Sequence, residues 1–366
     1  MTIERVVLAG GGTAGHVSPL LATADALRAR HPQVEISVLG SEGGLEEDLV
    51  PARGYDLTLI PKVAFPRRPN GAAVRFPGSF RKAVKRTRSL LDERDAQVVL
   101  GFGGHVSTPA YLAARGRRTP FVIHEQNARP GLANKLGARM TPYVATTFSS
   151  TPLPGAEVIG LPLRREITEL DRSALRGRAR ETFGLDAERP TLLVTGGSLG
   201  ALSLNEAVWG ARDALAEAGV QVLHLTGRGK GFDAAEAKAP YTVLEYADRM
   251  DLCYAAADLV VTRSGAGMVC ETSAVGLPSV YVPLPIGNGE QKLNAADTVA
   301  AGGALLIDND DFTRSWVESE LVGLVTDADR LSIMSAAMRA QQHAGAADAL
   351  VDLAERAIAE SVEENR

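Results

Sequence analysis

The sequence has few cysteines, no long apolar run and little excess charge, and each of these absences narrows what the chain can be. Its 366 residues include two cysteines, Cys253 and Cys270, too few for a disulfide framework, so we interpret both as buried thiols of a reducing compartment. No segment approaches the ~20 uncharged apolar residues of a membrane-spanning helix. The N-terminus lacks the basic and apolar regions of a signal peptide, and a net charge of −5 predicts no nucleic-acid partner.

The sequence is rich in short β-branched runs that alternate with helical patterns. This alternation is typical of the α/β class, in which helices cover parallel sheets. A chain of this length can form two such domains of ordinary size. Strands are predicted at 5–9, 34–39, 57–60, 97–100, 121–123, 144–146, 157–159, 191–195, 220–225, 242–244, 259–261, 279–282 and 304–307.

The segment 160–164 (GLPLR) is interpreted as a hinge between the two domains. The first domain is predicted at 1–162 and the second at 163–345. Two amphipathic helices are expected near the C-terminus, separated at about Gly345. The last helix, 346–366, is expected to pack back on the first domain.

Two glycine-rich turns lie about half a chain apart, at 10–16 (GGGTAGH) and 196–201 (GGSLGA). Each follows an apolar run typical of a strand and precedes a helical pattern. Glycines let the backbone turn tightly and approach a ligand, and the start of the next helix presents unpaired N–H groups to an anion. The sequence therefore predicts two phosphate-binding turns, one in each α/β half.

The first turn also matches the dinucleotide fingerprint G-x-G-x-x-G through Gly10, Gly12 and Gly15. That fingerprint requires an acidic residue at the end of the second strand, and the first acidic residue here, Glu42, lies beyond it in a loop. The fit to a dinucleotide site is therefore poor. His16 follows the last glycine, where a neutral imidazole could accept a proton from an attacking hydroxyl, or could cap the helix or bind a phosphate.

Another turn of this type, 101–107 (GFGGHVS), follows the predicted strand 97–100. Backbone amides of this turn and the first could together hold a pyrophosphate without a metal. The motif 124–127 (HEQN) and the segment 131–135 add polar side chains at the end of the next strand, the usual ligand edge of such sheets. The residues predicted for the pyrophosphate are Gly12, Gly103, Gly104 and His105.

In the second half, Arg263 precedes the segment SGAGMVCE, which ends at Glu271. The glycines open a helix whose N-terminus could receive a diphosphate, and Glu271 follows where a carboxylate can accept both hydroxyls of a ribose. A buried salt bridge is the alternative role for Glu271. The acidic run 308–310 is interpreted as a helix cap rather than a metal site. Three polar residues that can bind sugar hydroxyls begin a later helix: Glu290, Gln291 and Asn294.

One segment departs from the acidic balance of the chain. Between Asp56 and Asp92 there is no acidic residue, whereas basic residues recur together with phenylalanines. A basic helix with aromatic side chains suits an anionic membrane surface, where each Lys or Arg adds on the order of 1 kcal/mol. The alternative is an ordinary solvated helix face. The residues predicted to meet the membrane are Phe76, Phe80, Arg81, Lys82, Lys85 and Arg86.

Together these motifs resemble those of the MurG family of bacterial glycosyltransferases. The resemblance rests on the order and spacing of the segments 11–16, 101–107, 124–127, 196–201 and 263–271. It implies the GT-B fold, an α/β architecture of two Rossmann-like parallel-sheet domains facing a deep cleft. It also implies inverting transfer of N-acetylglucosamine from UDP to the 4-hydroxyl of undecaprenyl-pyrophosphoryl-muramoyl-pentapeptide, the step from lipid I to lipid II in peptidoglycan synthesis.

The resemblance further implies roles for individual residues. His16 would be the general base, Glu271 would bind the ribose, the backbone near Ala247 would face uracil, and the pyrophosphate site would belong to the acceptor. No metal or other cofactor would be required. The residues implied to bind UDP-N-acetylglucosamine are Thr13, Ala14, Gly15, Asn127, Arg164, Ser198, Ala247, Ala266, Gly267, Met268, Val269, Cys270, Glu271 and Gln291.

Some residues depart from the family pattern. Ala14 stands where glycine is common, so its backbone is expected to avoid positive φ. Glu290 replaces a usual glutamine, which puts one sugar contact in doubt. The remaining departures are His105, which often is a tyrosine in the family, and the segment 287–289, which replaces a more charged stretch.

The resemblance also implies a location and partners. The basic segment would bind the inner leaflet, making the protein a peripheral enzyme on the cytoplasmic face of the cell membrane, near other cell-wall synthesis and division proteins. The close alternatives are another GT-B UDP-sugar transferase and a UDP-N-acetylglucosamine epimerase, and the segments 101–107 and 124–127 argue against both. A nicotinamide oxidoreductase and a non-catalytic nucleotide-sugar sensor are more remote.

Overall fold

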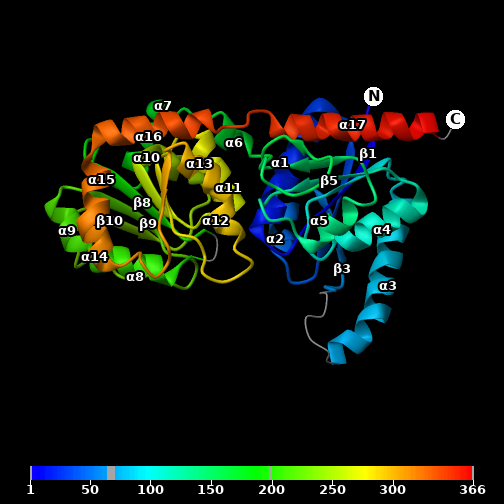
Figure 1. The fold of residues 1–366 in the computed structure, drawn as a ribbon, viewed down its shortest axis with the longest axis horizontal. Helices are drawn as coiled ribbons and strands as arrows, with labels where there is room; N and C mark the ends of the chain where they lie inside the picture. The colour runs from blue at the N-terminus through cyan, green and yellow to red at the C-terminus, as the bar shows by residue number, and fades with distance from the viewer. Residues whose placement is uncertain (1, 64–70, 198–199, 365–366) are drawn as a thin grey trace. The chain divides into compact units, whose positions relative to one another are not determined.

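The computed structural model describes residues 2–63, 71–197 and 200–364. It divides the chain into two compact units (Figure 1). Unit 1 comprises Met1–Arg164 and Gly345–Arg366, and unit 2 comprises Arg165–Ala344. The predicted Ser198 contact and the part of the basic segment at 64–70 lie outside the described residues.

Unit 1 contains a parallel sheet in the order β3-β2-β1-β4-β5-β6-β7. Its strands are β1 (Arg5–Ala9), β2 (Glu35–Ser41), β3 (Asp56–Ile60), β4 (Val98–Gly101), β5 (Phe121–Glu125), β6 (Val144–Thr146) and β7 (Glu157–Val158). Strand order reverses between β1 and β4, where Ala9 pairs with Gly101. The loops that follow these two strands therefore start side by side, at the position where open α/β sheets bind ligands.

The helices of unit 1 cover both faces of this sheet (Figure 1). The last helix of the chain packs along the first, where its apolar residues, such as Leu350 and Ala354, are buried in the same core. His31 Nε2 lies 2.9 Å from Glu355 Oε1 at this contact. The helices are α1 (Ala14–Arg30), α2 (Glu46–Ala52), α3 (Gly71–Glu93), α4 (Ser107–Arg117), α5 (Leu132–Gly137) and α17 (Ala346–Glu364).

Helix α3 carries the predicted membrane residues on two different faces. Phe76 and Phe80 stack with ring centroids 5.3 Å apart, and both are half-buried against the core that also contains Ala83 and Leu90. The residues Arg81, Lys82, Lys85 and Arg86 are exposed. Figure 1 shows the N-terminal end of α3 projecting beyond the sheet of unit 1. The helix is thus amphipathic, with its phenylalanines on the apolar side.

The six-stranded sheet of unit 2, β10-β9-β8-β11-β12-β13, repeats the order of β3-β2-β1-β4-β5-β6 in unit 1, and its strands are all parallel. Thr195 of β8 pairs with Thr262 of β11 where the order reverses, so the loops after these two strands are neighbours. The strands are β8 (Thr191–Thr195), β9 (Gln221–Leu225), β10 (Tyr241–Leu244), β11 (Leu259–Thr262), β12 (Ser279–Tyr281) and β13 (Ala304–Leu306).

The helices of unit 2 are mostly short. They are α6 (Arg165–Thr168), α7 (Arg172–Thr182), α8 (Leu202–Gly210), α9 (Arg212–Glu217), α10 (Met250–Ala256), α11 (Ala266–Ala274), α12 (Glu290–Asn294), α13 (Ala296–Ala300), α14 (Arg314–Trp316), α15 (Val322–Thr326) and α16 (Ala328–Ala340). The predicted two parallel-sheet domains are confirmed, and the strands in both units end within two residues of the predicted positions.

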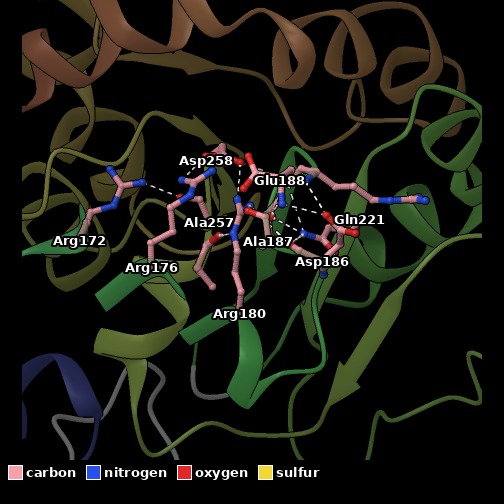
Figure 2. Close-up of polar contacts among 12 residues, drawn as sticks. Arg172, Arg176, Arg180, Asp186, Ala187, Glu188, Gln221, Ala257 and Asp258 are labelled. Carbon is pink, nitrogen blue, oxygen red and sulfur yellow. Dashed lines mark hydrogen bonds and ion pairs between the residues drawn. The ribbon is translucent and has the colours of Figure 1, made fainter. Parts of the chain in front are cut away.

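A row of arginines on α7 anchors two of these helices (Figure 2). Arg176 and Arg180 pair with the Asp258 carboxylate, at 2.6 and 2.9 Å. Arg172 donates to the carbonyls of Tyr254 at 3.0 Å and Gly276 at 2.9 Å, near the C-terminal ends of α10 and α11. Cations are favourable at helix C-termini. Arg172 therefore ties the C-terminal parts of α10 and α11 to α7, and the N-terminal end of α11 carries predicted donor contacts.

Candidate active site

The first glycine turn connects β1 to α1 at the point where the strand order of unit 1 reverses. Gly12 has φ +89°, a conformation that favours glycine. Thr13 is the N-cap residue of α1, and Ala14 is its first helical residue. Among the described residues other than glycine, positive φ occurs at Asp95 and Arg118, so Ala14 avoids it as predicted.

A buried carboxylate that the sequence analysis missed lies beneath this turn. Glu46 is 0% exposed. Its Oε2 accepts the Gly12 N–H at 2.8 Å, and its Oε1 accepts the Ser41 N–H at 2.8 Å and the Ser41 hydroxyl at 3.0 Å. Burial acts to raise the pKa of this carboxyl, but these hydrogen bonds outweigh it, and the pKa lies below its usual value. Glu46 is therefore ionised. The Gly12 amide already donates to this carboxylate. The pyrophosphate contact predicted for Gly12 stays a prediction.

Glycines form the walls around this carboxylate. A Cβ added at Gly11 would lie 2.1 Å from Glu46 Oε1, and one at Gly44 would lie 2.2 Å from Oε2. At Gly40 the added Cβ would lie 2.6 Å from Glu46 Cγ. The signal that could have revealed the site is the set of glycines at 11, 40 and 44, which only the fold brings together.

His16 lies between the first turn and the turn that follows β4. Its Nδ1 is 2.9 Å from Thr13 Oγ1, and a Cβ added at Gly103 would lie 3.1 Å from its Nε2. Gly103 and Gly104 have φ +91° and +81°, and a Cβ at Gly104 would lie 2.5 Å from the Gly11 carbonyl oxygen. The structure thus brings His16 together with these two predicted pyrophosphate residues.

The imidazole of His16 is neutral at neutral pH. Burial lowers its pKa to about 4, and His105 lowers it further, whereas Glu46 and a hydrogen bond to the Gly11 carbonyl act to raise it. A general base must be unprotonated before it acts, and His16 satisfies this condition. The two neighbours that favour its protonated form, Glu46 and the Gly11 carbonyl, both belong to the surroundings of the first turn.

His124 and Glu125 of the HEQN motif (124–127) form hydrogen bonds within the protein. Glu125 is 2% exposed and accepts the N–H groups of Asn127 and Gly131, each at 3.0 Å, and the Asn134 amide at 2.9 Å. His124 Nε2 lies 2.9 Å from the Gly160 carbonyl. These contacts stabilise the loop after β5, which leaves Asn127 half-buried at the C-terminal edge of the sheet. Glu125 therefore positions Asn127, and His124 joins the end of β5 to the Gly160 backbone.

The second glycine turn is packed tightly around its backbone. A Cβ at Gly196 would lie 2.2 Å from the Ala201 nitrogen, and one at Gly200 would lie 2.1 Å from the Thr226 carbonyl oxygen. Gly197 has φ +77°, and its N–H donates to Thr195 Oγ1 at 3.2 Å. This turn leads directly into α8, as predicted for an anion-binding turn.

Arg263 holds the neighbouring loop against this turn. One guanidinium nitrogen donates to the carbonyls of Val282 and Pro283, each at 3.0 Å. The other donates to Ser203 Oγ and Asn309 Oδ1, each at 2.9 Å. Burial lowers the pKa of Arg263. The side chain thus links the end of β11 to the start of α8, and Asn309 of the acidic run 308–310 belongs to this scaffold.

Helix α11 carries most of the residues predicted to bind the donor. Gly265 is its N-cap, and Ala266, Gly267, Met268, Val269 and Cys270 form its first turns. Glu271 follows and is half-buried. Its Oε2 accepts the Tyr254 hydroxyl at 2.6 Å. Tyr254 is a second residue that sequence reasoning missed, and it joins α10 to the carboxylate predicted to bind the ribose.

The remaining predicted donor residues, Ala247, Arg164 and Gln291, lie in loops or at the start of a helix. Ala247 is half-buried in the loop between β10 and α10, and Arg164 is the last residue of the first segment of unit 1. Gln291 Oε1 accepts the Leu284 N–H at 2.9 Å, so this amide shapes the loop before α12. Within the part of the chain that the structure describes, no cluster of three or more His, Cys, Asp or Glu residues is arranged to hold a metal ion.

Family comparisons match both units. The Glycosyltransferase family 28 N-terminal domain matches residues 6–146, and the Glycosyltransferase family 28 C-terminal domain matches residues 191–350. Together these two domains cover most of the chain, and they match its two halves in the expected order.

Full-length relatives carry a specific name. A protein of Nocardioides sp. is 56% identical and covers 92% of this chain and 93% of its own length. One from Clavibacter sepedonicus is 53% identical over 96% of each chain. Both are named UDP-N-acetylglucosamine–N-acetylmuramyl-(pentapeptide) pyrophosphoryl-undecaprenol N-acetylglucosamine transferase.

Solved structures confirm the GT-B type of fold. The crystal structure of MurG from Acinetobacter baumannii has a TM-score of 0.78 and 27% identity, and the match covers 96% of this chain and 99% of that one. A UDP-GlcNAc 2-epimerase from Neisseria meningitidis has a TM-score of 0.67 at 12% identity. The second likeness shows a shared fold alone.

Proposed function

Because the chain belongs to glycosyltransferase family 28, we propose that it transfers N-acetylglucosamine from UDP-N-acetylglucosamine to N-acetylmuramyl-pentapeptide carried on pyrophosphoryl-undecaprenol. The observation that carries this proposal is the identity of 53–56% to relatives named for that reaction, over more than nine-tenths of each chain. The reaction is the step from lipid I to lipid II in peptidoglycan synthesis.

The proposed mechanism is a direct displacement with inversion. A ring nitrogen of His16 takes the proton of the acceptor 4-hydroxyl while that oxygen forms a bond to C1 of N-acetylglucosamine. The bond between C1 and the UDP oxygen breaks on the opposite face, and its electron pair leaves on the β-phosphate. The neutral state of His16 supports this role.

The departing UDP needs stabilisation of its negative charge. We assign this to the N-terminus of α11, the amides of the turn 196–201, Arg164, and Ser198, whose role stays a prediction. These groups act on the diphosphate directly, so the proposed reaction needs no metal. A test is turnover in the presence of EDTA, which should equal turnover in its absence.

The donor contacts are proposed from the positions of the predicted residues. Glu271, oriented by Tyr254, accepts the ribose hydroxyls, the backbone near Ala247 faces uracil, and Gln291 meets the sugar hydroxyls. On the unit 1 side, Thr13, Ala14, Gly15 and Asn127 approach the donor sugar. The acceptor pyrophosphate lies on Gly103, Gly104 and His105.

We also propose that the exposed basic face of α3 binds an anionic membrane surface on its cytoplasmic side. The described helices include none that is long and apolar enough to cross a membrane. Four exposed cations line one face of α3, which suits an anionic surface. Phe76 and Phe80 are half-buried on another face, and their membrane contact stays a prediction. Co-sedimentation with anionic vesicles should fall strongly when Arg81, Lys82, Lys85 and Arg86 become glutamate. Equal binding by both proteins would overturn the membrane assignment, and other cell-wall or division proteins remain proposed partners.

The central experiment measures UDP release. The protein is incubated with labelled UDP-N-acetylglucosamine and a short-chain lipid-pyrophosphoryl-muramoyl-pentapeptide. UDP should appear only when both substrates are present, with the label on the lipid. UDP-N-acetylglucosamine consumed without acceptor would instead indicate a hydrolase or an epimerase.

A further inference from the structure

Glu46 has no role in the function proposed so far, yet the first turn is built around it. It is the first residue of α2 and comes from a different strand connection than the turn. Its two oxygens bind the backbone of that turn and of the end of β2. A buried carboxylate costs several kcal/mol unless hydrogen bonds compensate it, so such a group needs a specific reason to be there.

The position of this carboxylate is unexpected for an anion site. A glycine turn that binds phosphate directs its amides at the ligand, whereas here the Gly12 amide points at Glu46, at 2.8 Å. A fixed negative charge beneath the turn disfavours an anion above it and favours a cation. The cation available on this turn is His16 in its protonated form.

We propose that Glu46 is a positioning residue for the transfer reaction: it fixes the turn 10–13 and stabilises the positive charge that His16 gains on accepting the acceptor proton. The inference rests on the proposed function. The proton passes from the acceptor hydroxyl to His16, and Glu46 stays ionised throughout, so no further bond is made or broken.

The groups around His16 are consistent with His16 accepting the proton and Glu46 stabilising the resulting charge. Thr13 binds Nδ1 and the Gly11 carbonyl accepts from the ring, so both orient the imidazole. His105 is the neighbour that opposes a positive charge on His16, and Glu46 is the acidic one that supports it. The backbone of Gly103 packs closely against the ring, since a Cβ added there would lie 3.1 Å from His16 Nε2.

The test is a double-mutant cycle in the UDP-release assay. Glu46→Gln removes the charge with little change of shape, and we expect kcat to fall at least tenfold while the affinity for UDP stays within threefold. In the His16→Ala background, Glu46→Gln should cause at most a threefold further loss, because the positive charge that it stabilises is then absent and only its hold on the turn remains. The matched control is Glu47→Gln, an exposed neighbour on the same helix, which should behave as wild type.

Opposite results would overturn the proposal. These are a kcat for Glu46→Gln within threefold of wild type, or the same tenfold loss in the presence and absence of His16. If Glu46→Gln does not fold, as judged by thermal melting, the cycle is repeated with Glu46→Asp, which withdraws the carboxylate and keeps its charge. If the wild-type protein releases no UDP with the lipid acceptor, the proposed function has failed and not this inference alone.

Discussion

The two glycine-rich turns occupy the same place in their sheets, but groups of opposite charge lie beside them. Glu46 accepts an N–H of the first turn, whereas Arg263 donates to Ser203 in the first turn of the helix that follows the second. Both charged groups are buried and both are held by backbone and hydroxyl partners. The same type of strand–turn–helix connection therefore occurs next to a buried negative charge in unit 1 and next to a buried positive charge in unit 2.

The charge buried beside an α/β turn can therefore adapt the turn to either side of one displacement. In the proposed mechanism, positive charge develops on His16 and negative charge develops on the leaving diphosphate. A carboxylate beneath one turn and a guanidinium beside the other match these two needs. Binding of the donor diphosphate by the first turn, or no contribution to it from the second turn, would contradict this assignment.

The largest expected effect is that of His16→Ala, which tests the first turn. Removing a general base typically lowers kcat by about 10²–10⁴-fold, and we expect a loss in this range. The affinity for UDP should change less than threefold, because this turn is assigned to the acceptor and the donor sugar and not to the UDP part of the donor. Steady-state UDP release and a UDP titration measure the two quantities. Unchanged turnover would eliminate His16 as the base.

Arg263→Met tests the second turn. The change removes the donor to the buried carbonyls of Val282 and Pro283, and each buried acceptor left unsatisfied costs about 1–3 kcal/mol before relaxation. Ser203 and Asn309, which are half-buried, lose the same donor but keep their bond to each other. We expect the free energy of unfolding of unit 2 to fall by about 2–3 kcal/mol, with weaker UDP binding. Thermal and denaturant unfolding measure the stability. Arg189→Met, at an exposed site in the same unit, is the control, and equal stability of the two variants would contradict the role of Arg263.

The two charged groups also show where sequence reasoning succeeds and where it stops. Strand positions, the order of the glycine turns and the histidine at the end of the first turn follow from local patterns and were predictable. Glu46 was not, because it contacts Gly12 across 34 residues of sequence and resembles any acidic residue in the first turn of a helix. Arg263 was predicted near the diphosphate, but the neutral partners of its guanidinium come from three separate segments that only the fold assembles.

The phenylalanines of α3 illustrate the same limit. Composition predicted aromatic side chains interleaved with cations, and the helix instead separates them onto different faces. The spacing of Phe76, Phe80, Ala83 and Leu90 follows the helical period and could have shown this. Which helix face meets the core, however, depends on how α3 packs against α4, and that contact is not encoded in either helix alone.

Glu271→Ala tests the donor site of unit 2. Hydrogen bonds to a charged group contribute about 1.5–3 kcal/mol each, so we expect the UDP dissociation constant to rise by about 10–100-fold. Tyr254→Phe should raise it less, because it removes only the hydroxyl that orients Glu271. Isothermal titration with UDP measures both, and Glu206→Ala, at an exposed position on α8, is the control. A Glu271→Ala protein that binds UDP as tightly as wild type would exclude the ribose assignment.

The smallest expected effect is on the pH dependence of kcat, and it separates the environment of His16 from that of an ordinary histidine. The base acts when it is neutral, so its contribution is lost as pH falls through its pKa. With that pKa lowered to about 4 by burial, the neutral fraction changes little between pH 7.5 and pH 5.5, and kcat at saturating substrates should stay within about twofold. A histidine at the usual value of about 6.5 would lose about tenfold over the same range. A tenfold fall that disappears in His16→Ala would show that the first turn does not hold its histidine neutral, and the contrast between the two turns would then rest on Arg263 alone.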